Sequence, residues 1–227
     1  MLDGYIPFGQ AVITKEEYLA NKEYYDNSGF LNVLGTEGIS TGVTGGFENY
    51  EKLKSYIESL ISNTNIKYRL GSGNNGNPFS TDNKVLIDNP HFVTWFIKNS
   101  GFVETMSYDD ANSGIDSLLY TNLLDEVNPL KSSSDDYYSK MGYINNAVLG
   151  DVLFFDTFQR NGSVGIYISS GKILLVDENN NRVYNMWVDN EDGTVDYTYW
   201  MDRFNGTIKR IPSLNKEDYI WHAKIMD

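Results

Sequence analysis

The sequence contains no cysteine and only two histidines, which excludes several kinds of catalytic and metal-binding site. Without cysteine there is no disulfide, no thiolate metal site and no thiol nucleophile. No run of apolar residues approaches the length of a membrane span, so we expect no membrane partner. Basic residues are also few, 18 Lys and Arg against 31 Asp and Glu. Because phosphate contacts need clustered cations, we expect no nucleic-acid partner.

The first 46 residues differ in character from the rest of the chain. The opening MLDGYIPFGQ has no basic stretch followed by an apolar one, so we expect no signal peptide. A short helix is expected around Lys15–Tyr25, followed by the glycine-rich stretch GTEGISTGVTGG. We interpret residues 1–46 as an arm with a flexible tether, which either joins copies of the chain or other proteins or is a simple N-terminal extension. Residues 47–227 are then one globular domain.

The order of the remaining patterns indicates an α+β fold, with helices first and strands later. Phe47–Asn63 has apolar residues at helical spacing, IKYRL reads as an extended segment, and shorter helices are expected at Ile115–Leu124 and Asp135–Tyr143. From Leu149 onward, turn signals separate the short strands DVLFF, VGIYI, KILLV, RVYNMW, TYWM and TIKRI. We therefore expect N-terminal helices packed on an antiparallel β-meander.

The most informative stretch is Val85–Phe102, VLIDNPHFVTWFIKNSGF, which predicts an extended segment followed by a buried helix. Asn89 suits the N-cap position, because its side-chain oxygen can accept hydrogen bonds from free N–H groups in the first turn. Pro90 suits the first helical position. Apolar residues on most sides indicate burial, and Gly101 is the expected stop.

Two motifs and both histidines are candidates for binding a cofactor or a metal. GSGNNG matches a dinucleotide loop in letters, but it leads into turn residues rather than a helix. DNEDGTVD resembles a calcium loop, but Val188 stands where the first acidic ligand is required, which favours a hairpin tip. No ligand spacing accompanies His91 or His222, and His222 reads as a packing residue. We therefore expect no cofactor and no metal.

Three segments together resemble the NlpC-type papain-like peptidases, which cut the stem peptides of peptidoglycan. They are YRLGSGNNGNPFSTDNKVLIDNPHFVTWFIKNSGF, LGDVLFFDTFQRNGSVGIYISSGKILLV and YWMDRFNGTIKRI. The third is similar to the versions found in bacteriophage lysins and tail proteins of Gram-positive hosts. The resemblance covers Phe47–Ile211 and implies a papain-like fold of the NlpC type.

The catalytic positions implied by this resemblance hold residues that cannot perform the family's chemistry. That chemistry needs a thiolate at a helix N-terminus, a histidine on the facing strand and a third polar group. Those positions correspond to Asn89, to Ser163, and to Leu174 or Leu175. An amide does not ionise in the relevant range and a serine is no general base. Pro90 also lacks the backbone N–H that could donate to an oxyanion at that position.

The resemblance and the replaced residues predict a pseudoenzyme that keeps the fold for its shape. Tyr68 and Asp88 stay as the family has them, and we expect Tyr68, Asp88, Asn89, His91 and Ser163 to line the former groove. The predicted role is a structural or recognition component of a bacteriophage tail or virion. Its partners would be other virion proteins or peptidoglycan. It would be found in the virion, or in the host cytoplasm during assembly.

Two alternative functions stay open from the sequence. The first is a residual peptidoglycan hydrolase, an endopeptidase or amidase that uses His91 with Asp88 in place of the lost residues. The second is an inhibitor or immunity protein that mimics a hydrolase. The plainest interpretation of Asn89, a helix cap, is compatible with all three functions.

Overall fold

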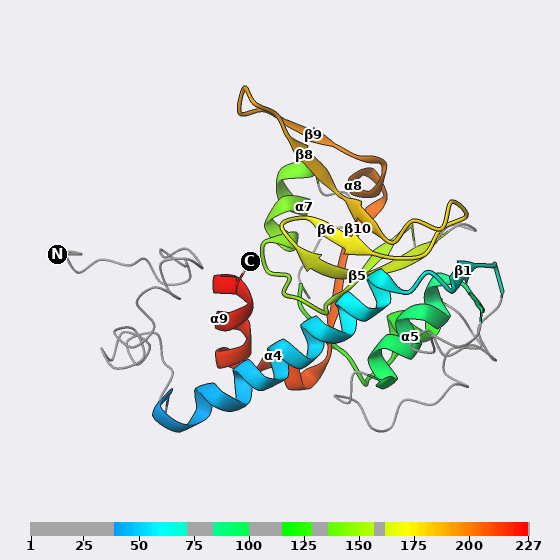
Figure 1. Ribbon diagram of the computed structural model, residues 1–227. Helices are drawn as coiled ribbons and strands as arrows, with labels where there is room; N and C mark the ends of the chain where they lie inside the picture. Colours follow the sequence, from blue (N-terminus) through cyan, green and yellow to red (C-terminus); the bar gives the residue numbers. More distant parts are fainter. Residues whose placement is uncertain (1–38, 72–83, 100–114, 129–135, 157–161, 227) are drawn as a thin grey trace. The chain divides into compact units, whose positions relative to one another are not determined.

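The computed structural model describes residues 39–71, 84–99, 115–128, 136–156 and 162–226 (Figure 1). The chain divides into two compact units, one of residues 53–213 and one that joins residues 1–52 with 214–227. The helix expected at Lys15–Tyr25, the first part of the expected tether and the stop at Gly101 lie outside the described residues.

The larger unit contains a six-stranded antiparallel sheet with the spatial order β3-β10-β4-β5-β6-β7. Its strands are β3 (Asp125–Glu126), β4 (Val152–Phe155), β5 (Ser163–Ser169), β6 (Lys172–Leu174), β7 (Val183–Asn185) and β10 (Phe204–Arg210). Two further strand pairs stand apart from it, namely the parallel pair β1 (Ile66–Tyr68) with β2 (Val85–Ile87) and the antiparallel hairpin β8 (Trp187–Asp189) with β9 (Val195–Tyr197).

The helices described are α4 to α9, with one short 3-10 helix, η2. Their bounds are α4 (Ile39–Ser62), α5 (Asn89–Asn99), α6 (Ile115–Tyr120), α7 (Tyr137–Ile144), α8 (Tyr199–Arg203), η2 (Pro212–Asn215) and α9 (Glu217–Met226). In the smaller unit, the ring of Tyr50 on α4 lies 6.0 Å from the ring of Tyr219 on α9, and both side chains are buried.

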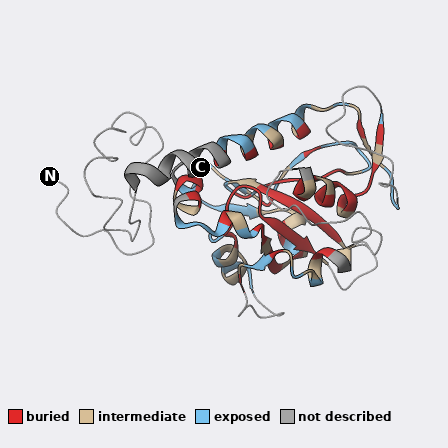
Figure 2. Cartoon of the chain, turned by 90° about the horizontal axis from the view of Figure 1, so that it is seen from below, coloured by how far each residue is buried: buried red, intermediate tan, exposed pale blue. Residues whose placement is uncertain are grey.

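These elements confirm the predicted α+β class and the antiparallel meander. Strand β4 pairs with β5, β5 with β6 and β6 with β7, while β10 returns to the other side of β4. All four residues of β4 and the first five of β5 are buried, as expected for central strands covered on both faces (Figure 2). Helix α5 packs on β5.

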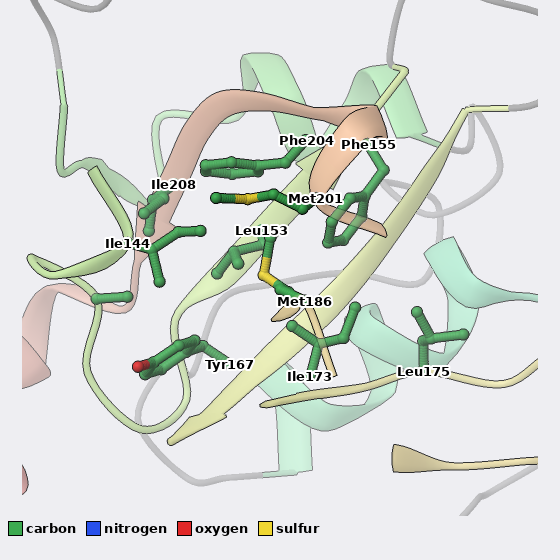
Figure 3. Close-up of a cluster of buried hydrophobic side chains, with 11 residues drawn as sticks. Ile144, Leu153, Phe155, Tyr167, Ile173, Leu175, Met186, Met201, Phe204 and Ile208 are labelled. Carbon is green, nitrogen blue, oxygen red and sulfur yellow. The ribbon is translucent and has the colours of Figure 1, made fainter. Parts of the chain in front are cut away.

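A cluster of apolar side chains joins the sheet to α7, α8 and the segment before β8 (Figure 3). Burying each of the larger side chains contributes about 1.5–3 kcal/mol relative to leaving it in water. The members of the cluster are Ile144, Ala147, Leu153, Phe155, Tyr167, Ile173, Leu175, Met186, Met201, Phe204 and Ile208. This cluster holds β5, which carries Ser163, and β6, which carries Leu174.

Two expected elements differ from the structure. The segment TYWM is not a strand, because Thr198 caps a short helix there and accepts a hydrogen bond from the backbone N of Trp200 at 3.3 Å. Helix α4 begins at Ile39 rather than Phe47, so part of the glycine-rich stretch is helical instead of a tether. Adding residues to an existing helix is far easier than starting one, and each interior glycine costs only about 1 kcal/mol.

The segment DNEDGTVD forms the tip of the β8–β9 hairpin, as the sequence predicts. The backbone N of Asn190 donates to the carbonyl of Thr194 at 2.9 Å, and Gly193 adopts a φ of +81° that suits glycine. Among the described residues there is no group of three or more His, Cys, Asp or Glu side chains able to hold a metal ion.

A buried ion pair ties the start of β4 to the end of β10. The guanidinium of Arg210 donates to both carboxylate oxygens of Asp151, at 2.8 and 2.7 Å, and also to the carbonyl of Asn146 at 2.8 Å. Burial raises the pKa of the Asp151 carboxyl, while the charge and hydrogen bonds of Arg210 act in the opposite direction. Each partner therefore depends on the other to stay buried.

We predict that Arg210→Met lowers the free energy of unfolding by about 3–5 kcal/mol, because it leaves a buried carboxylate without its counter-ion. The partly exposed pair between Arg203 and Asp156, joined at 2.7 Å, provides a matched control. Arg203→Met should cost about 1 kcal/mol. Urea unfolding of both variants measures the difference, and equal losses would contradict the assigned role of the buried pair.

Candidate functional site

The first turn of α5 is capped by Asp88 rather than by Asn89, so the predicted cap is off by one residue. The Asp88 carboxylate accepts a hydrogen bond from the backbone N of His91 at 3.1 Å, and its carbonyl accepts the first helical bond from Phe92 at 2.9 Å. Pro90 accordingly occupies the second helical position instead of the first. Both Asp and Asn make good caps, and Asn89 is engaged elsewhere.

The side chain of Asn89 joins α5 to two separate parts of the sheet. Its Nδ2 donates to Ser163 Oγ at 3.0 Å, and its Oδ1 accepts from the backbone N of Val176 at 2.7 Å. The Val176 N–H can only donate, which fixes the orientation of the amide. Asn89 is 7% exposed and Ser163 is 8% exposed, so these bonds are almost fully removed from water.

The third position implied by the resemblance carries apolar packing residues. Leu174 pairs with Ile166 of β5, and Leu175 donates its backbone N–H to the carbonyl of Arg182 at 2.9 Å; both leucine side chains are fully buried. The contact to Asn89 comes instead from the backbone of Val176, directly after them. Sequence reasoning missed this partner because no side-chain pattern marks a particular backbone N–H.

Asp88 and His91 form a second buried pair at the same helix end. Asp88 Oδ1 lies 2.6 Å from His91 Nδ1, and Asp88 Oδ2 accepts from the backbone N of Gly71 at 3.0 Å. The carboxylate fixes the ring and favours a proton on Nδ1. The hydrogen bonds of His91 run to Asp88, whereas those of Asn89 run to Ser163 and Val176, so the two pairs are separate.

Tyr68 at the end of β1 is half-buried and lies within electrostatic reach of Asp88. Burial raises the pKa of the Tyr68 hydroxyl, and the negative charges of Asp88 and Glu178 raise it further. The phenol is therefore neutral over the physiological range of pH and is a hydrogen-bonding group rather than a base. Its backbone N contacts the side-chain oxygen of Asn180 at 3.4 Å.

The loop that follows Val176 is fastened next to β1 by the nearly buried side chain of Arg182. Its guanidinium donates to the carbonyl of Asn180 at 2.9 Å and to the carbonyl of Ile66. Burial lowers the pKa of Arg182, and the nearby Asp177 acts in the opposite direction. This loop is thus held at one end by Asn89 and at the other by Arg182.

The structure brings the predicted site residues together in two groups, Asn89 with Ser163 and Asp88 with His91. All four are at most 9% exposed, so little of these side chains is in contact with solvent. The other histidine, His222, lies buried in α9 of the smaller unit. The arrangement is a set of buried polar groups joined to one another and to the backbone by hydrogen bonds.

Comparison of the chain with models of known protein families and with curated proteins gives no match. None of the helices in the described ranges is both long enough and apolar enough to span a membrane.

We predict that Asn89→Ala speeds hydrogen exchange at the Val176 amide by at least about tenfold, because this N–H loses its acceptor. The Tyr167 amide, which donates to the Asp151 carbonyl at 2.7 Å, serves as the internal reference for global opening. Ser163→Ala keeps the acceptor of Val176 and should leave the exchange ratio of the two amides unchanged. An unchanged ratio in Asn89→Ala would contradict the assigned bond.

Proposed function

We propose that this chain is a non-catalytic, NlpC-like domain that serves as a structural or recognition component, in a bacteriophage tail or virion. The observation that carries the proposal is the direct bond between Asn89 and Ser163. These residues stand at the positions of the nucleophile and the base in the family that the sequence resembles. The tail or virion setting is supported by the resemblance of YWMDRFNGTIKRI alone.

The separation of the two side chains matches that of a working nucleophile and base, but the groups themselves cannot react in that way. Nδ2 of Asn89 and Oγ of Ser163 are 3.0 Å apart, within the range expected for such a pair. Neither an amide nor a serine hydroxyl exchanges a proton near neutral pH as a thiol and an imidazole do. The pair is therefore a structural contact in the place where the family holds its reactive one.

The environment of the pair supports a role in shape rather than in peptide binding at this point. Both polar atoms of the Asn89 amide already have partners, and Ser163 is nearly buried. A peptide entering here would have to break two hydrogen bonds and leave a buried backbone N–H unpaired, at a cost of about 1–3 kcal/mol. Recognition by this domain is expected to use another surface.

A second candidate function is a hydrolase that uses His91 with Asp88. The observation that favours it is the 2.6 Å contact between His91 Nδ1 and the Asp88 carboxylate, which is how an acid orients a general base. Such a base still requires a nucleophile or a water molecule at its second nitrogen. With His91 only 9% exposed, that approach is restricted.

We predict that the purified chain does not clear Gram-positive cell walls, because the chain has no cysteine and both of its histidines are buried. The measurement is a turbidity assay together with analysis of released peptides, with an active NlpC-type peptidase as the positive control. His91→Ala should give the same null result as the unaltered chain. Clearing by the unaltered chain that disappears in His91→Ala would replace the first function with the second.

A further inference from the structure

The β8–β9 hairpin forms a sheet of only two strands, which pairs with no other strand in the described ranges (Figure 1). Its base is fixed to the rest of the larger unit. Trp187 lies so close over Gly171 that a Cβ atom would not fit there, and Tyr197 stacks on Tyr137 with ring centroids 4.4 Å apart. Beyond this base, residues 191–196 are all exposed. The hairpin therefore presents two open strand edges on a fixed support.

The hydrogen bonds of the hairpin determine which backbone groups point outward. The backbone N of Asn190 donates to the carbonyl of Thr194 at 2.9 Å, so this pair faces inward. In an antiparallel ladder, inward and outward pairs alternate. Along the register, four residues then direct their N–H and C=O groups outward, namely Trp187 and Asp189 on β8 with Val195 and Tyr197 on β9. An extended polypeptide has donors and acceptors at the spacing that these groups require.

The hairpin carries negative charge that no cation within it offsets. Residues 187–197 include four acidic residues and no Lys or Arg. Asp192 accepts hydrogen bonds within the tip, whereas the carboxylates of Asp189, Glu191 and Asp196 have no hydrogen-bond or ion-pair partner among the described residues. Because successive side chains of a strand point to opposite faces, the register places Asp189 and Asp196 on different faces of the hairpin. A cationic side chain can therefore find a carboxylate on either face.

We propose that the β8–β9 hairpin binds an extended, cationic segment of a partner protein, which adds a third strand to one of its edges. The open edge selects a polypeptide, and the uncompensated carboxylates select one that carries Lys or Arg. Val188 is 46% exposed and Val195 is 38% exposed, so each strand also offers an apolar neighbour to the added side chains. This inference deepens the recognition role proposed above by naming the chemistry of the partner.

The same features argue against the other occupants of this edge. Two copies of the chain joined edge to edge would bring two acidic hairpins together, and like charges on paired strands are destabilising. A nucleic acid or an anionic lipid surface would be repelled both by the hairpin and by the formal net charge of −13. A strand that carries positive charge gains from the backbone pairing and from the field at once.

The test measures binding of two labelled octapeptides, TKVKTKVK and TEVETEVE, to the full chain by fluorescence polarisation. We expect saturable binding of the lysine peptide and none of the glutamate peptide. The double variant Asp189→Asn with Asp196→Asn should weaken binding at least about fivefold, because it removes attraction at close range. The matched control is Glu51→Gln with Glu58→Gln, which removes two exposed acids of α4 and should leave binding unchanged.

Hydrogen exchange then locates the bound strand. In the complex, the outward amides of one edge, Trp187 and Asp189 or Val195 and Tyr197, should exchange more slowly because they gain acceptors. The Asn190 amide, already bonded within the hairpin, is the internal reference.

Three results would overturn the proposal: no binding of the lysine peptide, equal weakening in the two double variants, or binding that leaves the outward amides unchanged. Self-association of the chain alone, with the same amides protected, would show that the edge pairs with a second copy instead. Because the wall-clearing assay is independent of these outcomes, failure here is separate from failure of the non-catalytic role.

Discussion

The side chain of Asn89 joins α5 of the larger unit to two separate parts of the sheet through buried hydrogen bonds. It is buried, it donates to the first residue of β5 and it accepts from the backbone directly after β6. A buried amide must satisfy both of its ends, because an unpaired donor or acceptor away from water is costly. These two bonds fix where α5 meets the sheet and where the loop after β6 begins.

The neighbouring Asp88 completes the helix end. Its carboxylate caps the first turn, contacts His91 and accepts from Gly71, so negative charge sits where the partial positive charge of the helix is concentrated. In a thiol enzyme the same end of the helix helps to hold a thiolate. Here the helix end stabilises a carboxylate that is already fully engaged, which agrees with a structural role for the whole junction.

The polar groups at the start of α5 are buried, whereas several aromatic side chains elsewhere on the larger unit are exposed. Where the sequence resembles a hydrolase, the polar groups are paired with one another and withdrawn from solvent. The resemblance assigns no site residue to α7 or α8, where the side chains of Tyr138 and Tyr199 are exposed to solvent.

Much of the fold was predictable because its strands and amphipathic helices leave strong periodic patterns. The meander from β4 to β7 and the hairpin tip at Gly193 follow from alternation and turn residues. Helix α8 was missed because five residues are too few to show helical spacing, and its aromatic residues suit a strand equally well. The sequence places the start of α4 at Phe47 rather than Ile39, because the intervening glycines are poor helix formers.

The candidate site was predictable only as a list of positions. That Asn89 belongs beside Ser163 followed from the resemblance, but the choice of Asp88 as cap and the bond to Val176 depend on contacts across the fold. Capping preference alone cannot decide which of two adjacent residues takes the cap position when both make good caps. The exposure of Tyr138 and Tyr199 could not be predicted either, since the packing of distant elements decides which tyrosines face solvent.

The most direct test of the account is a double-mutant cycle between Asn89→Ala and Ser163→Ala, followed by urea unfolding. If the two side chains form the buried hydrogen bond described, the losses of stability should not add. A favourable coupling of about 1 kcal/mol is then expected. Strictly additive losses would contradict the central claim that this pair is a structural junction at the place of a catalytic one.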